Sequence, residues 1–192
     1  DISTSSLAGY VAAVGKAVNI VDAYSQEELT QFHPKLSQGS TLDNILSMNT
    51  RSLMVLPIPH NKRLVGVMEV IHRKNGEPFS EQEFKLARET SPAIGQILSR
   101  LKEGFSTGTI SMETSVTSEK GLHRISQAIH SAKNINEILI KLIDPLLQLF
   151  ESQALTIYAV DHQSNEIFSK LKSGDQINEI RLPISPHSIA GW

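Results

Sequence analysis

The amino-acid sequence predicts an α+β fold, because strand and helix patterns occur in separate blocks along the chain. Residues 51–59 and 64–73 are rich in β-branched side chains and flank four polar residues, which is the pattern of an antiparallel hairpin. Three more short strands are predicted nearer the C-terminus, at residues 154–160, 166–171 and 177–184. Amphipathic patterns at residues 80–101 and 135–150 predict the principal helices.

A short helix is predicted at residues 4–14, followed by a long loop. The helix pattern combines an N-terminal cluster of hydroxyl side chains with apolar residues at helical spacing, namely Leu7, Tyr10, Val11 and Val14. Gly15 is placed to end this helix. Residues 18–21 alternate too poorly to predict a strand, and the polar residues 22–47 predict a lid-like loop with a helical turn or two.

Prolines refine the predicted boundaries of the middle elements. Pro57 and Pro59 cannot donate to a strand ladder, so the end of their strand is expected at an edge or outside the sheet. Ser80 and Glu83 have the spacing of a helix capping box, and Pro92 is expected to bend the helix that follows. Residues 104–118, rich in Gly, Ser and Thr, predict a linker.

The region after the linker predicts two helices before its three strands. Apolar residues between 122 and 132 repeat at helical spacing, and a second helix is predicted at residues 135–150. Asn134 is expected to cap this second helix, with Glu137 at the capping-box position, and Pro145 is expected to kink it.

One segment occurs twice in the chain. Residues 184–192 match residues 2–10 at five of nine positions, with conservative changes at two more. Coincidence between two generic helix starts is one explanation. The other is that the same structural junction occurs at both ends of the chain.

A series of short motifs follows one another in a characteristic order. They are Ser6-Leu7-Ala8-Gly9-Tyr10-Val11, the stretch from Gly15 to Ala23, Thr50-Arg51-Ser52-Leu53, Leu56-Pro57-Ile58, and Leu64-Val65-Gly66-Val67 with Val70, closed by Phe79-Ser80 and a long helix. Their order and spacing resemble a known family, the GAF domains. Residues 1 to about 100 resemble the second half of such a domain, and residues 118–192 resemble its first half. The resemblance implies a GAF/PAS-like central antiparallel sheet with helices packed on one face and a loop-covered pocket on the other.

The reversed order of the halves leaves the domain organisation open. Residues 1–103 are expected to form the C-terminal half of a GAF-like domain and residues 119–192 the N-terminal half of a second one. The halves could close into one permuted domain, pair between two chains as a swapped dimer, or stay as separate incomplete domains. In either closed form, residues 64–73 and 154–160 are expected to share one sheet. Because the chain starts with Asp1 and stops directly after a helix-start pattern, we expect a fragment.

Composition excludes several classes of function. The net charge of −2, with both signs interspersed, leaves no basic footprint for nucleic acid or for an anionic membrane. No apolar stretch is long enough to span a bilayer. The chain has no cysteine, so thiol chemistry and thioether attachment of a chromophore are excluded, and we expect a cytoplasmic protein. The scattered histidines predict no metal site, and no catalytic motif is present, so we expect no enzyme.

Five residues are candidates for ligand contact. The amides of Ser6, Leu7 and Ala8 lie at a predicted helix start, which favours an anion, although plain capping explains the same residues. Asp22 could accept a hydrogen bond from a ligand, or bond to its own backbone. Arg51 could reach an anion, or be a solvated arginine at a strand end.

The function that the resemblance implies is a sensory or regulatory small-molecule-binding module that controls an effector domain. The alternative is a ligand-free module for dimerisation or protein interaction. Members that bind cyclic nucleotides carry Asn-Lys, then Phe, then Asp-Glu after the last strand, and of the matching residues here only Phe79 is the same. Cyclic nucleotides are therefore disfavoured, whereas other anionic or nucleotide-like ligands stay open. The sequence identifies no cofactor.

Overall fold

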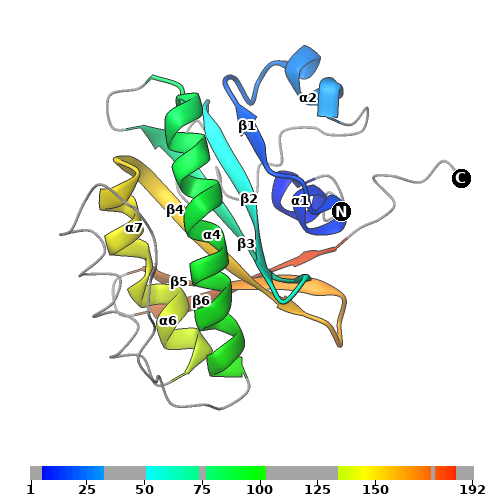
Figure 1. The fold of residues 1–192 in the computed structure, drawn as a ribbon, viewed down its shortest axis with the longest axis vertical. Coiled ribbons are helices and arrows are strands. Elements are labelled where there is room, and N and C mark those ends of the chain that lie inside the picture. Colours follow the sequence, from blue (N-terminus) through cyan, green and yellow to red (C-terminus); the bar gives the residue numbers. More distant parts are fainter. Residues whose placement is uncertain (1–5, 33–50, 74–76, 103–133, 174–175, 185–192) are drawn as a thin grey trace, which may run out of the picture.

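The computed structural model describes residues 6–32, 51–73, 77–102, 134–173 and 176–184. The described strands form a six-stranded antiparallel sheet in the order β1-β2-β3-β4-β5-β6 (Figure 1). Their bounds are Val18–Ile20 for β1, Leu53–His60 for β2, Arg63–Arg73 for β3, Ser152–Asp161 for β4, Glu166–Ser173 for β5 and Gln176–Pro183 for β6. The predicted α+β class with a central antiparallel sheet is confirmed.

Strands β2 and β3 form the predicted hairpin. A two-residue turn joins them, and its residues Asn61 and Lys62 both have positive φ angles, of 48° and 62°. Such a turn matches the right-handed twist of the strands that it connects. Strand β1 pairs with β2 only as far as Val55, so Pro57 and Pro59 lie on a stretch of β2 that has no outer partner among the described strands. The expected edge position of these prolines is confirmed.

Strands β3 and β4 join the two parts of the chain within one sheet. Their register places Met68 opposite Ile157 and Val70 opposite Leu155, and pairing continues to Arg73 opposite Ser152. The expectation that residues 64–73 and 154–160 share a sheet is confirmed by this register. The segment between β3 and β4 contributes helices to one face of the sheet.

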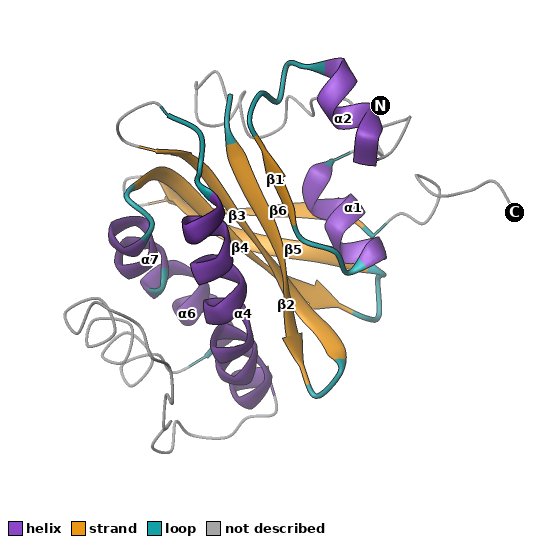
Figure 2. Ribbon diagram, turned by 45° about the horizontal axis from the view of Figure 1, so that its top comes forward, coloured by secondary structure: helices purple, strands orange, loops and turns teal. Residues whose placement is uncertain are grey.

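Helices cover both faces of the sheet (Figures 1 and 2). On one face lie α4 (Glu81–Lys102), α6 (Ile135–Lys141) and α7 (Ile143–Leu149), packed on alternate strand residues such as Leu56, Met68 and Ile157. On the other face lie α1 (Leu7–Val14) and α2 (Gln26–Phe32), where the buried strand residues include Val67 and Tyr158. Alternation along each strand thus supplies two separate apolar cores.

Local chemistry explains where the helices begin and end. Ser6 caps α1 by accepting a hydrogen bond from the Gly9 amide at 3.1 Å, and Gly15 ends the helix with a φ of 70°. At the start of α4, the Ser80 amide donates to the Glu83 carboxylate at 2.8 Å, while the Glu83 amide donates to Ser80 Oγ at 3.3 Å. This is the predicted capping box.

Prolines act differently in the two long helical segments. Helix α4 continues through Pro92, and the hydroxyl groups of Thr90 and Ser91 donate to carbonyls one turn back, at 2.8 and 2.9 Å. Residues 135–150, expected as one kinked helix, form α6 and α7 with the break at Leu142. Pro145 has no amide hydrogen for the carbonyl four residues earlier, which accounts for the interruption.

The outermost strand β6 carries a charged network. Arg181 pairs with Asp161 at 3.1 Å and with Glu166 at 3.3 Å, and its guanidinium lies 5.2 Å from the centre of the Phe168 ring. The hydrogen bond from Arg181 lowers the pKa of Asp161 to about 2. Charged side chains on an edge strand discourage pairing with the edge of another sheet.

Several predictions fall outside the described residues. They concern the linker at 104–118, the helical pattern between residues 122 and 132, the part of the predicted loop after Phe32, and the repeat copy after Ile184. Within the described part of that loop, α2 supplies the expected helical turns. The short strand β1 was missed, because only Val18 and Ile20 point into the core and the stretch is too short to show alternation.

Candidate functional site

The face of the sheet beneath α1 and α2 contains a buried polar pair within an apolar strand pattern. Along β3, Val67, Glu69 and Ile71 share this face, and Glu69 is only 7% exposed. The neighbouring strand β4 places Tyr158 on the same face, where it is completely buried. The Tyr158 hydroxyl donates to Glu69 Oε2 at 3.3 Å.

The electrostatics of this pair fix the direction of its hydrogen bond. Burial raises the pKa of Tyr158 well above its usual value, and the charge of Glu69 raises it further. The phenol therefore keeps its proton at physiological pH and remains a donor to the carboxylate. The α1 side of the sheet thus presents a buried, oriented acceptor group, which can recognise N–H or O–H donors of a ligand.

The candidate residues at the start of α1 form a capped helix terminus. Ser6 Oγ accepts from the Gly9 amide, so this hydroxyl performs the capping role that was the alternative to ligand contact. The amides of Leu7 and Ala8 have no acceptor within α1, because the first turn of a helix leaves its donors unpaired. A Cβ atom at Gly9 would lie 2.9 Å from the Pro183 carbonyl oxygen, which places this helix start against the end of β6.

Asp22 and Arg51 lie near one another beyond the ends of β1 and β2. The Asp22 carboxylate accepts from the Tyr24 amide at 3.0 Å, the backbone bond that was the alternative to ligand contact. Its own amide donates to Glu28 Oε2 at 2.9 Å. The Ala23 amide donates to the Arg51 carbonyl at 2.7 Å, which ties this loop to the start of β2.

The structure therefore brings two of the five candidates together and places the other three apart from them. Asp22 and Arg51 lie beyond Ile20 and Leu53, at one end of the sheet. Pro183, which adjoins the start of α1, belongs to the opposite end, since it pairs with Glu166 and Glu166 pairs with Asp161. Between these two ends, the eight residues of β2 span roughly 25 Å. Ligand contact by any of the five stays a prediction.

Sequence reasoning missed Glu69 and Tyr158. The signal for Glu69 was present, since it is the acidic residue at an inward position of an otherwise apolar strand. Tyr158 gave no comparable signal, because tyrosine is common in strands of this composition. Only the pairing of β3 with β4, across 89 residues of chain, brings the two together.

Replacing Tyr158 with phenylalanine tests how strongly the pair depends on its donor. We expect Tyr158→Phe to lower the free energy of unfolding by about 2 kcal/mol, because the buried Glu69 carboxylate loses a hydrogen bond while packing is kept. The matched control is Tyr10→Phe, which removes a hydrogen bond of 3.1 Å to the partly buried Phe32 carbonyl and is expected to lose about 1 kcal/mol or less. Urea unfolding measures both, and equal losses would contradict a special role for the buried carboxylate.

Neither a metal site nor a membrane span is found within the part of the chain that the structure describes. No three His, Cys, Asp or Glu side chains in that part gather into a cluster that could hold a metal ion. None of its helices is long and apolar enough to cross a bilayer.

Relatives of this chain are cyclic-nucleotide phosphodiesterases. The chain is 34% identical over 83 residues to the dual 3',5'-cyclic-AMP and -GMP phosphodiesterase 11 of Drosophila melanogaster, covering 43% of this chain and 5% of the relative. It is 32% identical over 87 residues to the cGMP-specific 3',5'-cyclic phosphodiesterase of Drosophila ananassae, covering 43% of this chain and 7% of that protein. The chain thus matches a small part of much longer relatives.

These relatives correct one expectation from the sequence. Cyclic nucleotides were disfavoured because only Phe79 matched the family signature after the last strand, and that inference is wrong, since the relatives are phosphodiesterases named for cyclic AMP and cyclic GMP. The inference failed because it excluded a ligand on the identity of a few signature residues after the last strand. In the structure, the Phe79 carbonyl accepts from Asn19 Nδ2 at 3.1 Å, so the backbone of this signature residue ties α4 to the edge strand.

The family itself follows from sequence and fold together. A family model for the GAF domain matches residues 1–98, just over half of the chain. The antiparallel sheet with α4, α6 and α7 on one face agrees with the fold that the resemblance implied, and α1 and α2 lie on the other face. The chain belongs to the GAF domain family.

Proposed function

We propose that this chain is a regulatory domain that senses a cyclic nucleotide on the α1 side of its sheet. The observation that carries the proposal is the Glu69 carboxylate, buried on that face and oriented by Tyr158. Such a carboxylate can accept hydrogen bonds from ribose hydroxyls and from the N–H groups of a purine base. The names of the relatives support cyclic AMP and cyclic GMP as the first ligands to test.

The candidate contacts from the sequence suggest how such a ligand would lie. We propose that the Leu7 and Ala8 amides, with Ser6 as their cap, face the cyclic phosphate, because helix starts favour anions. Asp22 and Arg51, tied together through the Ala23 amide, lie at the opposite end of the sheet and are not proposed to contact the same ligand. Glu69 lies on the sheet between these two groups.

Calorimetric titration of the whole chain with cyclic GMP and with cyclic AMP tests this function. We expect saturable binding of at least one of them, and Glu69→Gln is expected to weaken it about tenfold or more, because a charged acceptor is lost from a buried contact. The matched control is Glu89→Gln on the opposite face, where the carboxylate is exposed and pairs with Lys85 at 3.9 Å.

Two results would contradict the proposed function. One is the absence of binding of both cyclic nucleotides to a folded chain. The other is binding that Glu69→Gln and Glu89→Gln reduce equally, because a general loss of negative charge would then explain the effect. The absence of binding would favour the alternative function, a ligand-free module for dimerisation or protein interaction.

The proposed role is regulatory and non-catalytic. Ligand binding on one face of the sheet is proposed to change the packing of α4 on the other face. The reason is that alternate residues of β2 and β3 pack against α4 on one side and lie in the α1-side core on the other. We also propose that residues 1–103 and 119–192 are the back and front halves of GAF-like domains that complement one another. The β3–β4 register, which joins residues from both halves, supports this proposal.

A further inference from the structure

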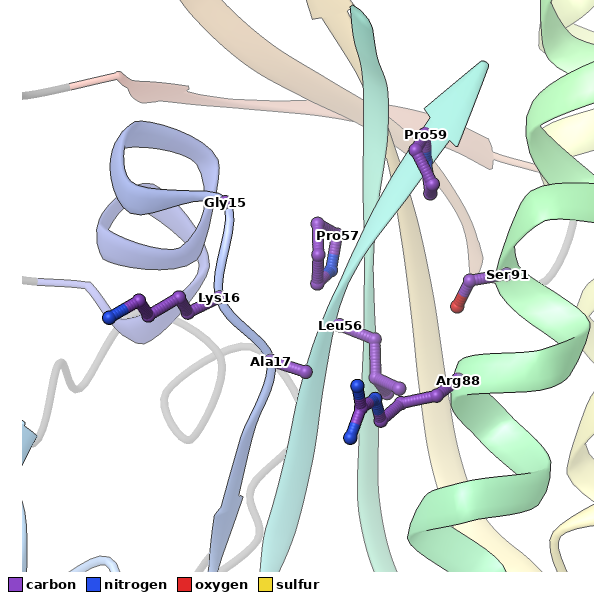
Figure 3. Close-up of a pocket in the computed structure, with 8 residues that line it drawn as sticks. All are labelled: Gly15, Lys16, Ala17, Leu56, Pro57, Pro59, Arg88 and Ser91. Atoms are coloured by element: carbon purple, nitrogen blue, oxygen red, sulfur yellow. The ribbon is translucent and has the colours of Figure 1, made fainter. Parts of the chain in front are cut away.

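A concave site lies on the α4 side of the sheet. A groove of about 420 Å³ runs between α4 and the edge where β1 adjoins β2 (Figure 3). Its lining residues come from three elements of the fold: Gly15, Lys16 and Ala17 from the loop before β1, Leu56, Pro57 and Pro59 from β2, and Arg88 and Ser91 from α4. The volume falls within the range of small-molecule pockets.

The groove exists because small residues and prolines lie where the helix and the sheet edge diverge. Helix α4 approaches β2 closely at Gly95, where a Cβ atom would lie 2.2 Å from the Pro59 carbonyl oxygen. One turn earlier, α4 faces Ala17 and Leu56, and the short Ala17 side chain leaves the space above it unfilled. The hydrogen bond from Asn19 to the Phe79 carbonyl ties the sheet edge to the residues just before α4.

The polar groups of the groove favour an anion. Arg88 extends from α4 across the groove toward Leu56 and Ala17, as Figure 3 shows, and no carboxylate of the described residues forms an ion pair with it. Lys16 adds a second cation at the rim, although its side chain points away from the groove. Ser91 is buried and donates its one hydroxyl hydrogen to the Ala87 carbonyl at 2.9 Å, so Arg88 is the lining side chain that can donate to an anion inside the groove.

The exposed edge of β2 argues against a bound peptide strand. An added strand needs both donors and acceptors from the edge that it joins. Pro57 and Pro59 have no amide hydrogen, so this stretch of β2 offers only carbonyl acceptors. Their rings, together with Leu56 and Ala17, instead supply an apolar wall for a compact ligand.

We propose that this groove binds a small organic anion, in which a carboxylate or phosphate is joined to a compact apolar group. The anionic group pairs with the Arg88 guanidinium, and the apolar group packs on Leu56, Ala17 and the proline rings. This site is separate from the proposed cyclic-nucleotide site, because Leu56 belongs to the core on the α4 side and Glu69 lies on the α1 side. The two proposals can therefore fail independently.

The test is an amide NMR titration of the whole chain with benzoate, phenyl phosphate and the neutral benzamide. We expect one or both anions to shift the resonances of residues 15–17, 88 and 91, and benzamide to bind roughly tenfold more weakly, the ratio that one charge-assisted hydrogen bond contributes. Benzoate and phenyl phosphate distinguish a carboxylate ligand from a phosphate ligand.

Variants on the same helix supply the control. Arg88→Gln is expected to weaken binding of the preferred anion about tenfold. The amide spectrum of this variant is expected to keep the dispersion of a folded protein. Lys85→Gln, which removes an exposed cation paired with Glu89, is expected to leave binding unchanged. Equal losses in both variants, equal binding of benzamide, or shifts confined to residues outside the groove would each overturn the proposal.

Discussion

Residues 1–103 and residues 119–192, produced as separate chains, are expected to be unfolded alone and to fold when mixed. Separation exposes the inner edge of β3 along its pairing with β4. It also divides the core on the α4 side, in which Met68 and Ile97 from the first part pack with Leu146 and Ile157 from the second. Neither part then buries enough apolar surface to offset the conformational entropy of ordering its chain.

Dispersion of amide resonances and a cooperative thermal transition measure the outcome for each part and for the mixture. The matched control is a copy of residues 119–192 carrying Ile157→Pro, which removes an amide from the centre of β4 and is expected to prevent complementation. If either part alone gave a cooperative transition and a dispersed spectrum, the halves would be independent domains.

Gly66→Ala is expected to destabilise the fold by about 3 kcal/mol, lowering the melting temperature by about 10 °C. A Cβ atom at this position would lie 2.4 Å from the Tyr158 carbonyl oxygen, which is backbone of a central strand and cannot move aside. It would also lie 3.2 Å from a methyl group of Leu98, so displacement toward α4 is restricted as well.

Gly15→Ala is the matched control for this substitution. Gly15 has a φ of 70°, and no atom lies within 4 Å of the place that a Cβ would occupy, so alanine there adds backbone strain without a collision. That strain is expected to be about 1 kcal/mol. Calorimetric melting measures the loss of stability in both variants. If Gly66→Ala lost no more stability than Gly15→Ala, β3 and β4 would be able to separate enough to admit a methyl group.

Most of the secondary structure could be predicted because its signals are local. The β2–β3 hairpin, the Ser80–Glu83 capping box and the interruption near Pro145 each depend on residues within a few positions of one another. Strand β1 could not be predicted, because a three-residue strand owes its conformation to its pairing with β2 and not to its own pattern. Tertiary pairing of this kind overrides weak local preference.

The candidate site was less predictable than the fold. The bond from the Tyr24 amide to Asp22, one of the two alternatives left open for that carboxylate, and the Ser6 cap are both local features. The Glu69–Tyr158 pair depends on which strand lies beside β3, and no local pattern specifies that neighbour. The groove at Arg88 likewise requires the position of α4 over the sheet edge.

The chain-order arrangement of the strands has a consequence for the rate of folding. The β2–β3 and β5–β6 pairs are hairpins between adjacent segments, which form in microseconds. The β3–β4 pair instead brings together segments as distant as Glu69 and Tyr158, 89 positions apart, so its formation requires closure of a long loop before any contact is gained. Non-local pairing of this kind slows folding. Of the strand pairs described, the β3–β4 pair therefore carries the largest cost of loop closure.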